Sequence, residues 1–173
     1  MSSDFVLDTR DLPRRPGEMK RYSRRIQLQS PLGIDIIAIP AGNELELDIT
    51  LESVSEGILA TVAFETEAEG ECGRCLDPLS QSLDVRVQEL YFYENQLEAE
   101  DEMVFYLEGE NLDLEIPIRD AVVLELPFSP LCSVECQGLC PECGQKWQEL
   151  PVDHAHELID PRWSKLGNLS LEE

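Results

Sequence analysis

The chain has 173 residues, of which 42% are hydrophobic, and it carries a formal net charge of −23. This length and composition are typical of one globular domain with a modest core, and no apolar run of about eighteen residues is present to span a membrane. The first residues lack the apolar core of a secretory signal, so we expect a cytoplasmic protein with reduced cysteines.

The charge is distributed unevenly along the chain. Residues 1–25 carry a net charge of +3, whereas residues 26–173 carry −26. Nucleic-acid phosphates repel such an acidic body, because proteins bind them through lysine and arginine. We therefore expect a basic protein as the partner, with no membrane and no small-molecule substrate. An acidic surface that only keeps the protein soluble is the alternative.

Residues 1–25 are predicted to form a basic N-terminal arm. Two prolines and a glycine within residues 12–17 interrupt regular structure there. The arm either touches RNA or leads into the first strand, with its arginines paired to the protein's own acidic groups; we favour the second interpretation. The side chains that would contact a partner or RNA are five arginines, namely Arg14, Arg15, Arg21, Arg24 and Arg25.

From Ile26 onward, apolar and polar residues alternate with the period of half-buried β-strands. The alternation is most regular over residues 44–52, where acidic and aliphatic residues predict a strand with one wet, acidic face. The pattern predicts an α+β fold that is mainly antiparallel β, with a barrel-like or sandwich-like body of about six to seven strands. The expected strands are residues 26–28, 34–38, 44–52, 58–65, 80–93, 103–107 and 112–116.

Two short helices are expected after the strands. Pro117 suits the first turn of a helix of about nine residues that ends at Pro127. Asp160 followed by Pro161 predicts a C-terminal helix from about residue 160. We expect residues 26–173 to form a single domain that includes a cysteine-rich zinc-knuckle lobe at residues 131–144.

All six cysteines lie in two short clusters. One is the Cys-x-x-Cys of residues 72–75, and the other is residues 131–144, with four cysteines. Two residues between paired cysteines allow both sulfurs to bind one zinc ion, and a following glycine allows the tight turn. Two such pairs far apart in sequence indicate one structural zinc site that joins two loops. The preferred ligands are Cys72, Cys75, Cys140 and Cys143.

Other ligand sets stay open at this point. Cys132 and Cys136 are alternative ligands, either with Cys72 and Cys75 or with the second Cys-x-x-Cys. The two histidines, His154 and His156, are substitutes that we expect instead to be solvated loop residues. Buried cysteines without metal are a further alternative.

A thiol redox switch formed by Cys72 and Cys75 is also considered, because Arg74 between them could lower a thiol pKa. The motif lies between two antiparallel strands rather than at a helix start, which disfavours this interpretation. The sequence contains no phosphate-binding glycine loop and no nucleophile motif, so we expect no enzyme.

Several motifs of this chain resemble the YceD family of large ribosomal RNA subunit accumulation proteins. They are Cys72-Gly73-Arg74-Cys75-Leu76, Gly138-Leu139-Cys140-Pro141-Glu142-Cys143-Gly144 and Asp160-Pro161-Arg162-Trp163. Many members have a further cysteine after the second motif, whereas this chain has none after Cys143. A metal site that relies on that later cysteine is therefore not expected here.

The resemblance implies a role in supporting the level of large-subunit ribosomal RNA, without implying an enzymatic activity. Together with the charge, it predicts a non-enzymatic ribosome-biogenesis factor whose acidic surface binds a basic ribosomal protein or assembly factor. The alternatives are an RNA-processing protein that binds precursor RNA through the basic arm, and the redox switch.

Overall fold

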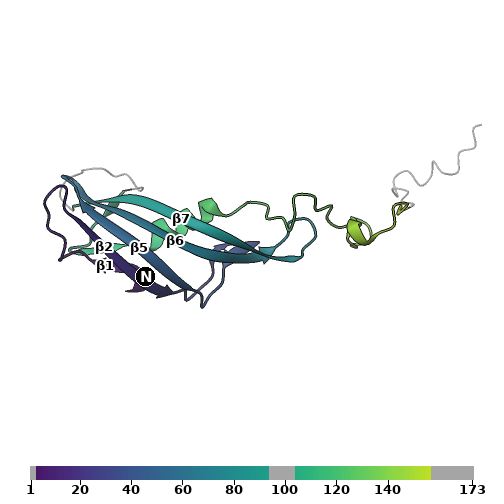
Figure 1. The fold of residues 1–173 in the computed structure, drawn as a ribbon, viewed down its shortest axis with the longest axis horizontal. Coiled ribbons are helices and arrows are strands. Elements are labelled where there is room, and N and C mark those ends of the chain that lie inside the picture. The colour runs from purple at the N-terminus through teal and green to yellow at the C-terminus, as the bar shows by residue number, and fades with distance from the viewer. Residues whose placement is uncertain (1–2, 94–103, 157–173) are drawn as a thin grey trace, which may run out of the picture.

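The computed structural model describes residues 3–93 and 104–156 of the chain. Seven strands form one curved, mainly antiparallel sheet, a half-barrel, which packs with the single α-helix of the described residues (Figure 1). The elements are η1 Ser3–Phe5, β1 Val6–Asp8, β2 Met19–Gln27, β3 Leu32–Ile34, β4 Ile37–Ile39, β5 Glu44–Ser53, β6 Gly57–Glu71, β7 Pro78–Phe92, β8 Phe105–Tyr106, β9 Asn111–Asp113, α1 Glu115–Glu125 and η2 Trp147–Glu149.

The long strand β6 organises the sheet. One edge of β6 pairs with β5 and then with the short β4, and the other edge pairs with β7 over its whole length. On the first edge, β2 pairs with β5 and β3 pairs with β4, which gives the order β2-β5-β6-β4-β3. On the other side, β8 pairs in parallel with the end of β7. The predicted mainly antiparallel β fold is confirmed.

The core lies between the inner face of the sheet and α1 with the β1–β9 pair. Alternate residues of β5 are fully buried, as the sequence pattern predicts, and Ile118 and Val122 of α1 pack into the same core. The helix ends where Leu126 becomes extended before Pro127, since proline disfavours a helical residue ahead of it. Among the described residues, no helix has the length and apolar character needed to cross a membrane.

Residues 3–25 differ from the predicted arm, because they belong to the folded body. Phe5, Leu7 and Leu12 are buried in the core, and β1 pairs with β9. The strand β2 begins at Met19 and pairs with β5 along nine residues. The sequence pattern hid this strand because charged residues occupy both of its sides: Lys20 and Arg24 are half-buried on the inner side, and Arg25 lies opposite Glu46 of β5 on the outer side.

Other boundaries shift locally. The expected strand 34–38 is two strands, β3 and β4, joined by a tight turn. The expected strand 112–116 ends at Asp113, and α1 begins at Glu115. The predicted C-terminal helix from residue 160 lies outside the described residues.

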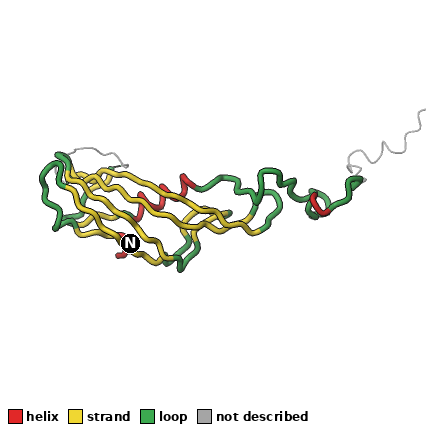
Figure 2. Tube along the Cα trace, in the orientation of Figure 1, coloured by secondary structure: helices red, strands yellow, loops and turns green. Residues whose placement is uncertain are grey.

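After α1 the chain leaves the body. Residues 127–156, here called the cysteine lobe, run past the tip of the β6–β7 hairpin and extend beyond it, mostly as loop (Figure 2). Strands of 15 residues reach about 50 Å, so this hairpin carries its turn to one end of the elongated β body, next to the cysteine lobe.

Candidate metal centre

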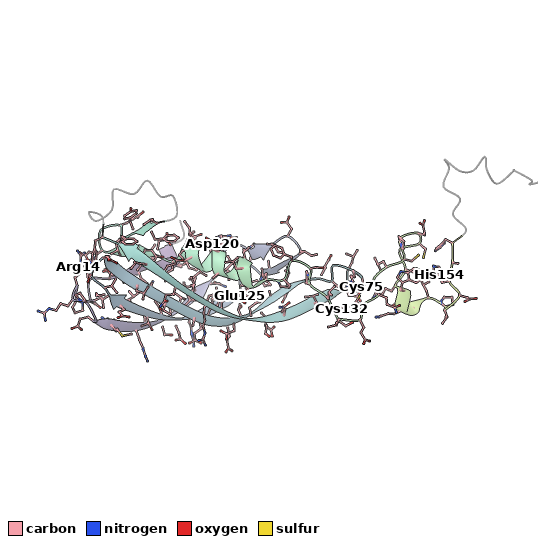
Figure 3. The ribbon with its side chains drawn as sticks, turned by 90° about the horizontal axis from the view of Figure 1, so that it is seen from above. Arg14, Cys75, Asp120, Glu125, Cys132 and His154 are labelled. Atoms are coloured by element: carbon pink, nitrogen blue, oxygen red, sulfur yellow. The ribbon has the colours of Figure 1, made fainter. Side chains whose placement is uncertain are left out.

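The turn of the β6–β7 hairpin meets the start of the cysteine lobe, and four cysteine sulfurs converge there. Their ligand atoms lie within 4.8 Å of one another, and Figure 3 shows Cys75 next to Cys132 at this junction. We call this group the four-cysteine cluster; its members are Cys72, Cys75, Cys132 and Cys136.

The spacing of these sulfurs fits a tetrahedral metal site. The Sγ atoms of Cys72 and Cys136 are 3.8 Å apart, and those of Cys75 and Cys132 are 3.5 Å apart. A zinc ion with four thiolates about 2.3 Å away would separate its sulfurs by about 3.8 Å. All six cysteines are described, and none forms a disulfide.

The two Cys-x-x-Cys motifs fold into the same turn. In the first, the N–H of Leu76 donates to the carbonyl of Cys72, and the N–H of Cys72 donates to the carbonyl of Asp77. In the second, Gly144 and Gln145 take the places of Leu76 and Asp77 around Cys140. Both Leu76 and Gly144 have positive φ angles, +61° and +69°. The sequence interpretation of two equivalent knuckles is therefore matched by their backbone geometry.

Hydrogen bonds hold the first knuckle against the lobe. The N–H of Gly73 donates to the carbonyl of Pro130 over 2.8 Å, and the guanidinium of Arg74 donates to the carbonyl of Cys136 over 2.8 Å. Gly138 packs so closely that a Cβ there would lie 2.9 Å from the carbonyl oxygen of Arg74. Arg74 therefore supports the shape of the cluster through its neighbours' backbone, and this use differs from the role of its side chain in the redox alternative, which the sequence disfavoured.

Backbone N–H groups converge on the Cys72 sulfur. Those of Cys132, Arg74 and Cys75 lower the pKa of this thiol to about 6, although burial raises it. The N–H of Asp77 lowers the pKa of the Cys75 thiol, but burial and the three neighbouring sulfurs outweigh it and raise this pKa to about 12. Four sulfurs this close cannot all ionise by themselves, and a divalent cation would remove that repulsion.

A second cluster lies farther out in the lobe. The Sγ atom of Cys143 is 3.7 Å from Nε2 of His154, and the ring of His154 contacts those of His156 and Trp147. Figure 3 shows His154 well separated from Cys75 and Cys132. We call this group the cysteine–histidine cluster; its four ligand atoms also lie within 4.8 Å of one another, and they come from Cys140, Cys143, His154 and His156.

The structure thus divides the predicted ligands differently from the preferred assignment. Cys72 and Cys75 meet Cys132 and Cys136, which was one of the alternatives, and the second Cys-x-x-Cys lies in the other cluster. The reason is local, because an antiparallel bridge between Leu139 and Lys146 closes the second knuckle on itself. Among the described residues, a single ion pair links this knuckle to the hairpin turn: Nζ of Lys146 lies 2.7 Å from Oδ1 of Asp77.

The two histidines are the candidate ligands that sequence reasoning undervalued. Both lie in loop as expected, with His154 half-buried and His156 exposed, and their ring nitrogens also belong to the cysteine–histidine cluster. The spacing gave only part of a signal: Cys140 and Cys143 have the cysteine spacing of zinc sites with two cysteines and two histidines, but one residue separates His154 from His156 where such sites usually have about three to five.

The five predicted contact arginines divide into two groups. Arg14 pairs with Glu110 at 2.7 Å, Arg24 donates to the carbonyl of Val6, and Arg25 pairs with Glu46 at 3.4 Å. Within the described part of the chain, Arg15 and Arg21 have no ion-pair partner. The favoured interpretation, that these arginines pair with the protein's own acidic groups, holds for Arg14 and Arg25, whereas Arg24 bonds to a backbone carbonyl instead.

The outer face of the sheet is strongly acidic. Two neighbouring grooves run across β5, β6 and β7 on this side, and Glu65 of β6 lies directly opposite Asp84 of β7. Like charges opposite each other destabilise a sheet pair. We call the groove-lining carboxylates the acidic face; they are Glu44, Glu46, Asp48, Glu65, Glu67 and Asp84.

Comparison with known proteins gives consistent matches. The profile of a family described as "Large ribosomal RNA subunit accumulation protein YceD" matches residues 60–170. An uncharacterized protein of Mycobacterium tuberculosis is 43% identical over 169 residues, which cover 96% of this chain and 81% of that protein. An uncharacterized protein of Mycobacterium leprae is 34% identical, with 96% of this chain and 78% of that protein covered.

A more distant relative carries a functional name. The chloroplastic large ribosomal RNA subunit accumulation protein YCED homolog 1 of Arabidopsis thaliana is 33% identical over 73 residues, which cover 42% of this chain and 23% of that protein. No solved structure matches the chain.

Proposed function

The chain belongs to the YceD family, and on that premise we propose that it is a non-enzymatic ribosome-biogenesis factor. In this proposal it supports the synthesis, processing or accumulation of large-subunit ribosomal RNA in the cytoplasm. It does so by binding a basic ribosomal protein or assembly factor.

The acidic face is the observation that carries the proposal. Its carboxylates line continuous grooves on an open sheet surface, and Glu65 and Asp84 face each other across two strands. Arg25 neutralises part of one end, through Glu44 and Glu46, and Arg86 lies 3.8 Å from Asp84, which leaves Glu65, Glu67 and Asp48 without an ion-pair partner among the described residues. Bringing a basic protein segment onto this surface relieves the remaining repulsion, and long-range attraction between opposite charges accelerates the encounter.

Zinc has a structural role in this proposal. The four-cysteine cluster offers four thiolates, which fill a tetrahedral ion and leave no position for a reacting water. The cysteine–histidine cluster offers four ligands of a second accepted type. We propose one zinc ion in each cluster, where it shapes the lobe instead of catalysing a reaction.

Direct RNA binding through the N-terminal arginines is a weaker candidate. Three of the five arginines already contact groups of this chain, and the acidic face would repel a phosphate backbone.

The test uses the full chain, immobilised and incubated with purified proteins of the large ribosomal subunit at physiological salt. We expect selective retention of one or a few basic proteins. The double variant Glu65→Lys with Asp84→Lys should reduce retention about tenfold or more. The matched control is Glu56→Lys with Glu52→Lys, which changes the net charge equally away from the grooves.

A cellular assay completes the test. In cells that lack the endogenous protein, the wild type and the control variant should restore large-subunit ribosomal RNA, and the acidic-face variant should not. Equal restoration by all three would rule out the acidic face as the partner surface. Retention of naked precursor RNA that disappears on neutralising Arg15 and Arg21 would favour the RNA-binding alternative.

A further inference from the structure

The second edge of β7 is open over most of its length. One edge of β7 pairs with β6 throughout, but on the other edge β8 pairs only with Tyr91 and Phe92. In the described part of the chain, no strand pairs with the second edge between residues 78 and 90. Unpaired strand edges are templates for strand addition.

The hydrogen bonds identify which backbone groups point outward along this edge. Tyr93 donates to Glu56 of the neighbouring turn, and Cys72 donates to Asp77, so odd-numbered residues of β7 bond toward β6. Residues alternate between the two edges in an antiparallel pair. The outward groups therefore belong to even-numbered residues, and Phe92 agrees, because its carbonyl accepts from Leu107 next to β8. The others are Ser80, Ser82, Asp84, Arg86, Gln88 and Leu90.

A groove follows this edge. Arg86, Val87, Gln88 and Glu89 line it together; since neighbouring side chains of a strand point to opposite faces, four consecutive residues share a groove only along the strand's edge. The opposite wall is one side of α1, and the groove encloses about 240 Å³. The residues that line that wall are Pro117, Asp120, Ala121, Leu124 and Glu125.

The groove has an apolar floor and an acidic rim. Val87 and Ala121 supply apolar surface, and the side chain of Leu124 is 84% exposed beside them. Glu89, Asp120 and Glu125 outnumber the single cation Arg86, and Figure 3 shows Asp120 and Glu125 along α1. A segment with alternating apolar and basic side chains complements both features.

We propose that the open edge of β7 accepts an extended, basic segment of a partner protein as an additional strand. Its backbone bonds to the outward groups from Ser80 to Leu90, and its apolar side chains point toward α1 and cover Ala121 and Leu124. Its cations point to the opposite face of the sheet, beside Asp84 of the acidic face, while Asp120 and Glu125 add negative charge at the rim. The short strand β8 already pairs with the end of the same edge. This inference rests on the proposed function and adds where and how the basic partner binds.

The experiment uses the full-length protein and a capped octapeptide of alternating lysine and valine as the probe. Residue-resolved hydrogen exchange should show that the amides of Arg86 and Gln88 exchange quickly in the free protein and are protected by the peptide. A glutamate–valine peptide of the same length should bind at least about tenfold more weakly, because the rim is acidic.

Two matched variants separate backbone pairing from simple charge attraction. Gln88→Pro removes an outward N–H without touching the β6 ladder, and it should weaken binding about tenfold or more. Gln88→Ala loses the same amide contact to Thr61 but keeps the N–H, and it should bind within about twofold of the wild type. Asp120→Lys with Glu125→Lys, on the helix surface, tests the site even if the proline variant does not fold.

Several results would overturn the inference: equal binding by Gln88→Pro and Gln88→Ala, protection confined to the acidic face, or outward amides already protected in the free protein. Its failure is distinguishable from failure of the proposed function. Loss of ribosomal-protein retention in the acidic-face variant, with normal retention in Gln88→Pro, would refute strand addition and leave the proposed function standing.

Discussion

In the β body, apolar side chains from the sheet, α1 and the β1–β9 pair form one continuous core. In the cysteine lobe, the buried residues among 127–156 are few, namely Pro130, Cys136, Gly138 and Cys140. The body can gain its stability from the removal of apolar surface from water, whereas the lobe has too little such surface. The lobe therefore depends on its cysteines and histidines, and the two regions should respond differently to the same perturbation.

Removal of metal should separate the two regions most strongly. We expect the protein to be purified with two zinc ions per chain. Chelation should disorder the lobe while the body keeps its structure, because metal binding supplies folding free energy only where the ligands lie. Native mass spectrometry and residue-resolved hydrogen exchange would measure both effects.

The clusters can be tested one at a time by matched serine variants. Cys72→Ser and Cys143→Ser should each lose one zinc ion, from the four-cysteine and the cysteine–histidine cluster respectively. One zinc ion in the wild type, lost from both variants, would instead indicate a single site shared by the two knuckles.

A core truncation should do the reverse. Leu47 is fully buried in β5, so Leu47→Ala should lower the free energy of unfolding of the body by about 2–5 kcal/mol. Zinc content and the amide spectrum of the lobe should not change. Chemical denaturation gives the magnitude, and Asp48→Ala on the exposed side of the same strand is the control, with an expected effect below about 0.5 kcal/mol. Simultaneous loss of zinc would show that the regions are coupled.

A glycine substitution tests the junction between them. Gly138 has a φ of +79°, and an added Cβ would lie 2.9 Å from the carbonyl oxygen of Arg74. Gly138→Ala should destabilise the four-cysteine cluster by about 1–3 kcal/mol, measured as faster zinc release to a chelator. Gly42→Ala is the matched control, because Gly42 has a φ of +88° but nothing within 4 Å. Equal release rates in both variants would mean that close packing against Arg74 contributes nothing.

An ion pair on the body should give the smallest effect. The hydrogen bond from Lys20 lowers the pKa of Asp11, and the hydrogen bond to Asp11 raises the pKa of Lys20. The carboxylate's contribution is therefore present above pH about 4 and lost as the pH falls further, and the ammonium's is lost above pH about 10.5.

We expect Asp11→Asn to lower the melting temperature only slightly at neutral pH, since both groups are exposed. The difference from the wild type should be constant between pH about 5 and 9, where both groups keep their charge, and vanish under more acidic conditions. A difference that grows as the pH falls would contradict this assignment.

Much of the β body follows from local pattern. The alternation in residues 44–52 predicts β5 with its buried and acidic sides, and the hairpin around Cys72 and Cys75 follows from the alternation on each side of it. The strand β2 escaped prediction, because its arginines obscure the period, and Arg25 acquires its partner Glu46 only when β5 lies beside it. Phe5 and Leu7 likewise become core residues only through β9 and α1.

The sequence by itself determined that two equivalent Cys-x-x-Cys turns exist, since a knuckle is built from neighbouring residues and their backbone bonds. It also determined the acidic character of the outer sheet face, through the alternation of charged and aliphatic residues. Only the tertiary structure decided which cysteines meet. That choice depends on how far the hairpin reaches and on where the chain leaves α1, which brings Cys132 and Cys136 to the turn and leaves the second knuckle to the two histidines.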